Sequence, residues 1–551
     1  MKKHNTIKVV LIALLAILLL TWIFPAAYYS GEYIDQGRVQ MGLSELFNYP
    51  MTALSYFGHI SLFIIFVGGF YGVLYKIPAY RTFLDKIVKA FERKEKLFLA
   101  IVIVLLSLGV SIAGAQIGFA MFIPFVVAII LLMGYDKIVA ALVVVGSLSA
   151  GLIGSTYAYN NLSLLNSILS LDIDYQIGVR FVILVVAIVL VIVNVFMYIS
   201  KYAKNVTISN TKSSVDDSIK NEDVKEEVIV KEEKEETPKA SAKTTSKKSS
   251  SSKSSKTSKS SSNKKGKSKS KNNNKAALRD EDIIVVKESV MNDSDGDDYL
   301  VPTRVGTTHK IWPFVVTFSL LFVLLIMAFI TWSDGGFGTT LFDDVTENVV
   351  GYELFGFPIF SKVYGAINSF GNWTLIDFFL PMALVLVILT FVYKVKLNDV
   401  LDGFAEGAKK ALAPAFVALL LYTVLVTTTY HPFQMSIYKA ILGLTKGFNI
   451  ATTAIVGFLS TVFNVDPAYA FQGLIPYYTS VVSSSDNYPI AGVIFQSMYG
   501  FASLIAPTSL VLMGTLAYLK VDYKEWLKNA WKLLLELFVV LLIIFIILAL
   551  I

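Results

Sequence analysis

Long apolar runs separated by short polar stretches dominate this chain of 551 residues. Many of the runs reach the roughly 20 residues that a helix needs to cross a hydrocarbon layer about 30 Å thick. Charged residues cluster between the runs. The pattern therefore predicts membrane-spanning helices in these candidate segments: residues 7–27, 51–75, 97–133, 138–158, 178–200, 311–331, 374–393, 411–430, 450–485, 489–518 and 533–551.

Two of these segments, 97–133 and 450–485, are too long for one crossing and are interrupted by small or polar residues. The interruptions are Ser107, Gly109, Ser111, Gly114, Gln116 and Gly118 in the first, and Asn464, Asp466, Pro467, Gln472, Gly473 and Pro476 in the second. Non-helical backbone is tolerated at membrane depth where it is buried in protein or lines a wet cavity. We therefore predict two re-entrant hairpins, each of which returns to the side from which it enters.

The distribution of Lys and Arg sets the expected orientation, because cytoplasmic loops are rich in these residues. Residues 76–96 carry seven of them, whereas Arg38 is the only one in residues 28–50. The first loop is therefore expected inside and the second outside. About nine crossings plus the two hairpins then fit the charges of the remaining loops and place the N-terminus and residues 205–308 in the cytoplasm.

The same order of segments makes the two halves inverted repeats. Eight residues recur without a gap at an offset of 352 (476 − 124 = 352): Phe119, Ile123, Pro124, Ile138, Ala150, Leu152, Ile153 and Thr156 match Phe471, Ile475, Pro476, Ile490, Ala502, Leu504, Ile505 and Thr508. Weak internal symmetry of this kind is typical of secondary transporters. The predicted fold is an all-α integral membrane protein with inverted repeats. Its parts are a first transmembrane repeat (1–204), a cytoplasmic insert (205–308), a connector helix with an outer loop (309–373) and a second, inverted repeat (374–551).

The insert changes from an acidic stretch to a low-complexity run of Ser, Lys and Asn. Its apolar surface is too small to offset the entropy of ordering, so we predict disorder. Two roles remain open for it: a solvated linker, or a basic segment that lies on the anionic inner leaflet of the bilayer.

Composition narrows the function further. The chain has no Cys, and its four His residues lack metal-ligand spacing, so a thiol nucleophile, a disulfide framework and a zinc enzyme are excluded. The net charge of +7 lies mostly in the insert and in short loops, where it sets topology, so nucleic-acid binding is not expected. No nucleophile, base and orienting group cluster in the sequence. We therefore expect neither an enzyme nor a bound cofactor.

Polar interruptions at equivalent positions mark the candidate binding site. Residues 151–156 interrupt the candidate span 138–158. Residues 505–509 interrupt the equivalent span 489–518, where Pro507 removes a helical hydrogen bond. Secondary transporters bind solute and ion where such discontinuous helices meet. The candidate ligands for substrate or ion are Ser155, Thr156, Asn160, Thr508 and Ser509, with Gln116, Asp466 and Gln472 from the hairpins.

Other interpretations of these residues stay open. Ser and Thr in membrane helices also serve helix packing, and Gln116 and Gln472 would equally satisfy each other's hairpin backbones. Asp466 is the only carboxylate near a hairpin break, so it is either a functional group or a cap at Pro467. The scarcity of buried carboxylates and His disfavours a proton relay and favours Na⁺ coupling. Arg180 is interpreted as an anchor at the membrane interface.

Several short motifs carry a family resemblance: residues 21–26 (TWIFPA), 134–136 (GYD), 151–156 (GLIGST), 404–408 (FAEGA), 505–509 (IAPTS) and 523–527 (YKEWL). On these motifs the chain resembles the YfcC family, in the C4-dicarboxylate anaerobic carrier and arginine/ornithine antiporter-like branch of the ion transporter superfamily. The resemblance implies cation-coupled or exchange transport of small carboxylates or amino acids across the plasma membrane of a bacterium. Related carriers suggest a homodimer by analogy.

The chain departs from that family pattern at both hairpins. Residues 114–117 (GAQI) stand where an acidic pair is expected, and residues 464–469 (NVDPAY) stand where a Pro-Ser-Gly-Ser-Gly-Gln stretch is expected. Two functions are therefore weighed. The first is a secondary active transporter, symporter or exchanger, of an amino acid, short peptide or C4-dicarboxylate. The alternative is a transport-inactive membrane scaffold that uses the insert to recruit partners or lipid.

Overall fold

The computed structural model describes residues 5–223, 300–302, 310–333, 336–365 and 367–550, with the backbone alone at 159–161, 202–223 and 364. Met1–Tyr202 with Val286–Ile551 form one compact unit, and Ala203–Val285 form another. Most of the predicted insert, residues 205–308, lies outside the described residues. Helix α9 (Ile177–Asp223) extends through its first part.

The described secondary structure is almost entirely helical. The other helices are α1 (Asn5–Ile23), α2 (Leu43–Tyr75), α3 (Pro78–Ala90), α4 (Glu95–Ala113), α5 (Gln116–Phe119), η1 (Ala120–Phe122), α6 (Ile123–Leu132), α7 (Lys137–Ile153), α8 (Tyr159–Leu169), α10 (Trp312–Phe329), α11 (Leu341–Val350), α12 (Ile359–Tyr364), α13 (Phe379–Val392), α14 (Leu397–Tyr430), α15 (Gln434–Leu442), α16 (Ile450–Phe463), α17 (Pro467–Val481), η3 (Ser485–Asn487), α18 (Tyr488–Ala502), α19 (Leu510–Leu519) and α20 (Tyr523–Leu550). Two short antiparallel hairpins, β1 (Ala26–Tyr29) with β2 (Tyr33–Gly37) and β3 (Glu353–Leu354) with β4 (Phe357–Pro358), lie in the predicted outer loops.

Seven helices in the described part of the chain are long and apolar enough to cross a membrane: α1, α2, α4, α9, α10, α14 and α20. Shorter apolar helices lie between them. The prediction of an all-α, multi-pass membrane protein is confirmed. The helices break at both predicted hairpin tips, after Ala113 and after Phe463. Whether each hairpin returns to the side it enters stays a prediction.

The element order of the first half recurs in the second. Helices α2, α3, α4–α6, α7–α8 and α9 correspond to α14, α15, α16–α17, α18–α19 and α20. The break between α7 and α8 includes Gly154, and the break between α18 and α19 includes Ala506, at the offset found in the sequence (506 − 154 = 352). The recurrence of eight residues therefore reflects a repeat of the helical arrangement.

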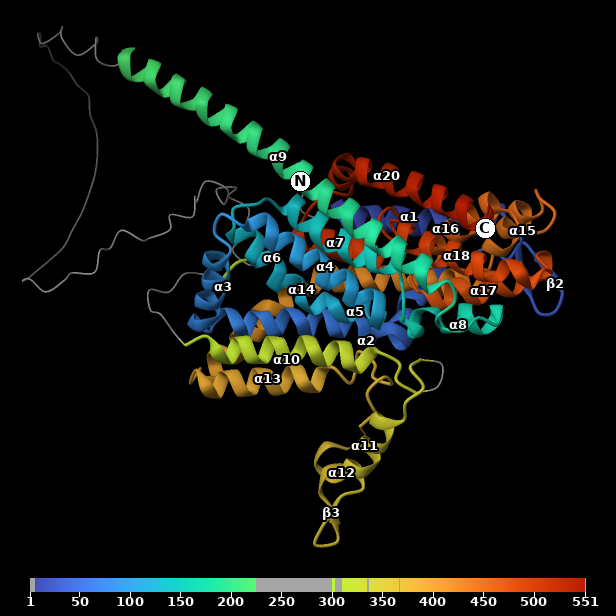
Figure 1. Ribbon diagram of the computed structural model, residues 1–551, viewed down its shortest axis with the longest axis horizontal. Coiled ribbons are helices and arrows are strands. Elements are labelled where there is room, and N and C mark those ends of the chain that lie inside the picture. Colours follow the sequence, from blue (N-terminus) through green and yellow to red (C-terminus); the bar gives the residue numbers. More distant parts are fainter. Residues whose placement is uncertain (1–4, 224–299, 303–309, 334–335, 366, 551) are drawn as a thin grey trace, which may run out of the picture. The chain divides into compact units, whose positions relative to one another are not determined.

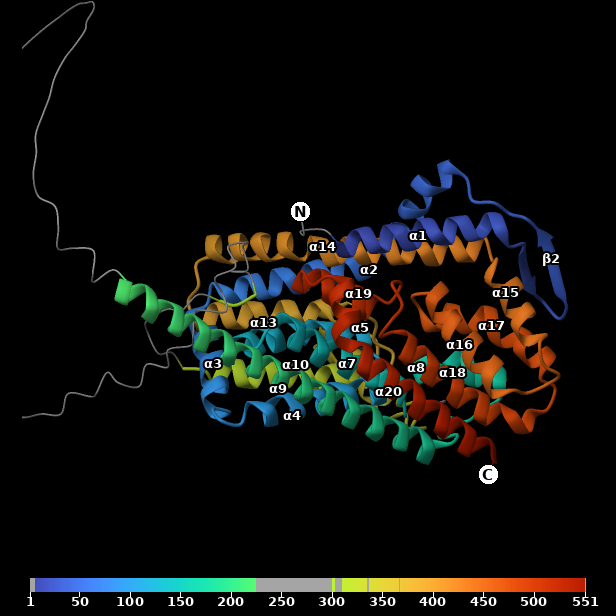
Figure 2. The same cartoon turned by 90° about the horizontal axis from the view of Figure 1, so that it is seen from above.

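The first helix of each half, α1 in the first and α13 in the second, packs on the opposite half. Helix α1 lies along α14 of the second repeat (Figure 2), and α13 lies beside α2 of the first repeat, next to α10 (Figure 1). Each long helix of the central pair α2 and α14 therefore has a helix from the opposite half on its side. This exchange joins the two repeats in one core.

Glycines allow α2 and α14 to approach closely where they cross. A Cβ atom at Gly72 would lie 2.1 Å from the carbonyl oxygen of Gly403 and 2.8 Å from the Cα of Gly407. A Cβ at Gly407 would in turn lie 2.1 Å from the carbonyl oxygen of Gly68. Backbone contacts at this distance leave no room for any side chain, as is common where membrane helices associate through small residues.

The substitution Gly72→Val is therefore expected to destabilise the protein by about 3 kcal/mol or more, because backbone cannot yield as a flexible side chain does. Thermal unfolding of the purified protein in detergent measures the effect. The matched control is Gly473→Val on α17, where an added Cβ meets no atom within 4 Å. Equal melting temperatures for the two variants would contradict the close crossing.

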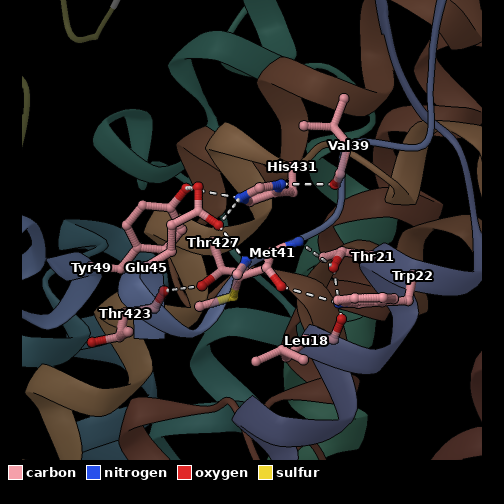
Figure 3. A network of polar contacts seen from close by, with 11 residues as sticks. Leu18, Thr21, Trp22, Val39, Met41, Glu45, Tyr49, Thr423, Thr427 and His431 are labelled. Carbon is pink, nitrogen blue, oxygen red and sulfur yellow. Dashed lines mark hydrogen bonds and ion pairs between the residues drawn. The ribbon is translucent and has the colours of Figure 1, made fainter. Parts of the chain in front are cut away.

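A polar network fixes the end of α14 to the segment between α1 and α2 (Figure 3). His431 Nδ1 lies 2.8 Å from the carbonyl oxygen of Val39, and Nε2 lies 2.8 Å from the Tyr49 hydroxyl. Because a carbonyl oxygen only accepts, Nδ1 carries a proton. The Tyr49 hydroxyl also lies 3.2 Å from Glu45 Oε1. Together these contacts hold the first turn of α2 against the end of α14.

Candidate functional site

The first hairpin meets the first helix break through Ser111, close to the hairpin tip. Helix α4 ends at Ala113 and is capped by Gly114, whose φ of 69° is left-handed and reverses the chain. Ser111 Oγ donates to the carbonyl oxygen of Gly154 at 2.7 Å, and the Ser111 carbonyl accepts from the N–H of Thr156 at 2.8 Å. The side chains of Ser111 and Thr156 are buried. The hairpin tip and the break between α7 and α8 are thus one hydrogen-bonded unit.

Arg180, in the first turn of α9, binds two carbonyl groups that this break leaves free and two in the segment just before α9. Its Nε donates to Ser155 at 2.8 Å and Nη2 donates to Thr156, while Nη1 donates to Ile173 at 2.7 Å and to Tyr175 at 3.1 Å. The side chain has no exposed surface, and the guanidinium carbon lies 4.4 Å from the centre of the Tyr175 ring. The prediction that Arg180 anchors the interface is wrong. Instead it is a buried cation whose desolvation is offset by four carbonyl acceptors.

The second repeat completes the first break. Gln496 Nε2, on α18, donates to the Ser155 carbonyl at 2.8 Å, and Ser497 Oγ donates to the Ile153 carbonyl at 3.0 Å. The hydroxyl of Tyr175 donates to Gln496 Oε1 at 3.1 Å. Both side chains from α18 are buried. The carbonyl groups of one broken helix are therefore satisfied partly by the broken helix of the other repeat.

Thr508 joins the second break to the second hairpin. Its Oγ1 lies 3.2 Å from the carbonyl oxygen of Thr461 and 2.9 Å from that of Val462, close to the end of α16. Thr156 occupies the equivalent position of the first repeat (508 − 156 = 352) and likewise donates to a hairpin carbonyl, that of Ser111, at 3.2 Å. The repeated Thr thus has the same role in both halves, which is to fasten a helix break to a hairpin tip.

Neutral donors satisfy the second break. Trp526 Nε1 donates to the Leu504 carbonyl at 3.0 Å, and the Tyr523 hydroxyl donates to the carbonyl of the following residue at 2.5 Å. The position equivalent to Arg180 is Lys532 (532 − 180 = 352), which is exposed on α20. The two breaks therefore differ in charge, because only the first holds a buried guanidinium.

A small polar cavity of about 20 Å³, room for roughly one water molecule, lies where the tips of the two hairpins and the second break meet. Its lining consists of Gln116, Ile117, Tyr422, Thr461, Asn464, Val465, Asp466, Tyr499, Ser503, Ser509, Leu510 and Val511. Among these described residues Asp466 is the only one with a charge. Its Oδ1 accepts from the Ala468 N–H at 2.9 Å and so caps α17. The two roles left open for Asp466 by the sequence are thus compatible.

Three of the predicted site residues, Gln116, Asp466 and Ser509, line this cavity. Ser509 also caps α19, since its Oγ accepts from the Leu512 N–H at 3.3 Å. Thr508 precedes it, with its hydroxyl bound to hairpin carbonyls. The structure therefore brings together one residue from each hairpin and the second break.

The other predicted residues lie elsewhere. Ser155 and Thr156 are buried at the first break and do not line the polar cavity. Gln472 lies on an exposed face of α17, away from that cavity. Asn160 is in the first turn of α8, and its side chain lies outside the described residues.

Sequence reasoning missed Arg180, Tyr422 and Tyr499. An Arg within an otherwise apolar span is a signal for the first of these, because such a residue needs buried acceptors. The two tyrosines lie among 28 in the chain, and no local pattern separates them from interfacial ones. Their place in the cavity follows only from how α14 and α18 pack.

A larger, apolar cavity of about 80 Å³ adjoins the polar one. Its lining consists of Phe63, Ile64, Val67, Gly68, Gln116, Ile117, Ala120, Ile123, Pro124, Leu148, Ala411, Pro414, Leu510, Val511, Gly514, Thr515 and Tyr518. The two cavities share Gln116, Ile117, Leu510 and Val511. The arrangement offers a solute one polar end and one apolar end.

Comparison with known proteins gives two matches. A family model described as DcuC, C4-dicarboxylate anaerobic carrier, matches residues 4–244 and 303–550. A protein of Escherichia coli (strain K12) named "Putative basic amino acid antiporter YfcC" is 29% identical over 177 residues, which are 29% of this chain and 34% of that protein. The chain thus matches about a third of the length of this relative. No solved structure matches.

Proposed function

This chain belongs to the C4-dicarboxylate anaerobic carrier family and is a multi-pass secondary transporter, and we propose that it moves a small carboxylate-bearing solute by symport or exchange. The resemblance deduced from short sequence motifs is confirmed by these matches. The proposed location is a bacterial plasma membrane, with the N-terminus and the insert in the cytoplasm. A homodimer in the lipid bilayer is proposed by analogy.

One observation carries the proposal, namely that structural elements of both repeats converge on one polar cavity. The cavity is lined by Gln116 from the first hairpin, Asp466 from the second and Ser509 from the second break. Inverted-repeat carriers place solute at the interface of their repeats and expose it alternately by moving one bundle against the other. A cavity between the repeats is where such a movement changes access.

The second break is the proposed place of a coupling cation, with Na⁺ preferred. The cavity lining there includes Thr461 and Asn464, which offer carbonyl and amide oxygens. Carriers coordinate Na⁺ with freed carbonyl groups and helix ends of this kind. The first break has less need of a mobile cation, because the guanidinium of Arg180 already binds its carbonyl groups.

A thermal-shift screen of the purified protein tests the proposal. Amino acids, dipeptides and C4-dicarboxylates are each added with Na⁺ and, separately, with K⁺. A solute at about 100 times its Kd should stabilise the folded protein by about 2.7 kcal/mol. Uptake of the stabilising solute into proteoliposomes, driven by a gradient of that cation or of the solute itself, then establishes transport. Absence of any shift and of any uptake would contradict the proposal.

Deletion of residues 245–299, which lie in the stretch that the family match leaves out, is expected to keep uptake within about twofold of the full chain. The reason is that the cavity lining comes entirely from residues 63–148 and 411–518. Uptake per reconstituted protein is the measurement. Loss of uptake in the deletion variant, with unchanged melting temperature, would favour the alternative in which the insert carries the function.

A further inference from the structure

The charges around the two cavities select one kind of solute. Asp466 is the only ionisable carboxylate, and no Lys, Arg or His lines either cavity in the described part of the chain. A carboxylate favours a cationic group nearby and opposes an anionic one. The end of the solute that lies against the second hairpin is therefore expected to carry an ammonium group.

The N-terminus of α19 provides the complementary place for a carboxylate. Ser509, Leu510 and Val511 line the polar cavity, and the last two are the first residues of this ten-residue helix. The first N–H groups of a helix have no partner within it and lie at the positive end of its dipole. We expect the carboxylate of an α-amino acid at this helix end and its ammonium group toward Asp466.

The apolar cavity then receives the rest of the solute. It begins at Ile117, Leu510 and Val511, which belong to both cavities, and continues between α2, α6 and α19. An aliphatic side chain there exchanges water for apolar contacts. A second carboxylate or a guanidinium would instead lose its hydration without an opposite charge to replace it.

From this geometry we infer that the transported solute is a zwitterionic amino acid with an apolar side chain, bound across both cavities. The inference rests on the proposed function and selects among its solutes. It excludes C4-dicarboxylates and basic amino acids as the preferred solutes, since each places a second charge in the apolar cavity.

The test measures the Kd of glycine, alanine, valine and leucine, with succinate and arginine for comparison, by ligand-dependent thermal shift of the full chain. Each methylene added to the side chain should lower the Kd about fourfold. The variant Gly514→Leu fills the apolar cavity, and the Cβ it introduces meets only the Leu510 Cδ1, at 3.6 Å. It should weaken leucine binding more than tenfold and leave glycine binding unchanged. Gly514→Ala is the matched control and should keep the order of the series.

The outcomes separate this inference from the proposed function. A shift with succinate or arginine but none with the apolar series would overturn the inference and leave the carrier intact. A Kd independent of side-chain length, or leucine binding unaffected by Gly514→Leu, would also overturn it. No shift with any amino acid, dipeptide or dicarboxylate would count against the carrier function itself.

Discussion

Replacement of Arg180 by methionine is expected to abolish uptake and to lower the free energy of unfolding by about 3–5 kcal/mol. Methionine keeps the unbranched apolar stem but lacks the guanidinium and donates no hydrogen bond, so it leaves four carbonyl groups, among them those of Ser155 and Thr156, without this donor. Removal of a buried charged partner costs about this much because the remaining polar groups stay dehydrated. Thermal unfolding in detergent and uptake into proteoliposomes measure the two effects.

Added methylguanidinium should partly restore the melting temperature of Arg180→Ala, since that variant leaves a cavity of matching shape and chemistry. Arg180→Lys should be intermediate, because an ammonium has the charge but cannot reach four carbonyl groups arranged around a planar fork. The matched control is Lys532→Met, the equivalent and exposed position of the second repeat, which should stay within about 0.5 kcal/mol of the native chain. Equal stability of Arg180→Met and Lys532→Met would contradict the role assigned to the guanidinium.

The buried guanidinium makes the two repeats chemically unequal. Both breaks keep the Thr that fastens them to a hairpin, Thr156 in the first and Thr508 in the second. The carbonyl groups of the first break are bound by the guanidinium of Arg180, whereas those of the second are bound by the neutral side chains of Trp526 and Tyr523. The first break is therefore held by a charged group and the second by neutral ones.

Much of the fold is determined by patterns that are local in the sequence. The apolar runs predict the helices, and the breaks at 151–156 and 505–509 predict the discontinuous ones, because Gly, Pro and hydroxyl residues interrupt apolar periodicity visibly. The recurrence of eight residues at an offset of 352 predicts that the two halves are repeats. It also predicts that helices α7–α8 and α18–α19 are equivalent, as the structure shows.

The site was less predictable because its contacts join residues far apart in the chain. Gln496 reaches the Ser155 carbonyl across 341 positions, and no local pattern on either helix indicates that partner. Tyr422 lines the polar cavity only because α14 packs beside the second hairpin. Gln472 shows the opposite error, since a polar residue close to a break lies on an exposed helix face. A repeat pattern thus locates a break but not the side chains that surround it.

The substitution Asp466→Asn is expected to lower uptake at least about 100-fold while the melting temperature changes little. Asn has nearly the same shape and caps a helix as well as Asp does, so the Ala468 N–H keeps an acceptor. What is lost is the only negative charge in the lining of the polar cavity. A hydrogen bond to a charged group contributes up to about 3 kcal/mol, and a difference of about 2.7 kcal/mol corresponds to 100-fold in affinity.

A second substitution separates the two roles of Asp466. Asp466→Ala removes both the charge and the cap, so it should match Asp466→Asn in uptake but unfold more easily by about 1 kcal/mol. Asp486→Asn, in the exposed turn η3, is the matched control and should change neither quantity. Native uptake by Asp466→Asn would show that the carboxylate serves only to cap α17. If instead both variants lose uptake and only the alanine variant loses stability, the charge acts on the solute or the coupling ion rather than on the fold.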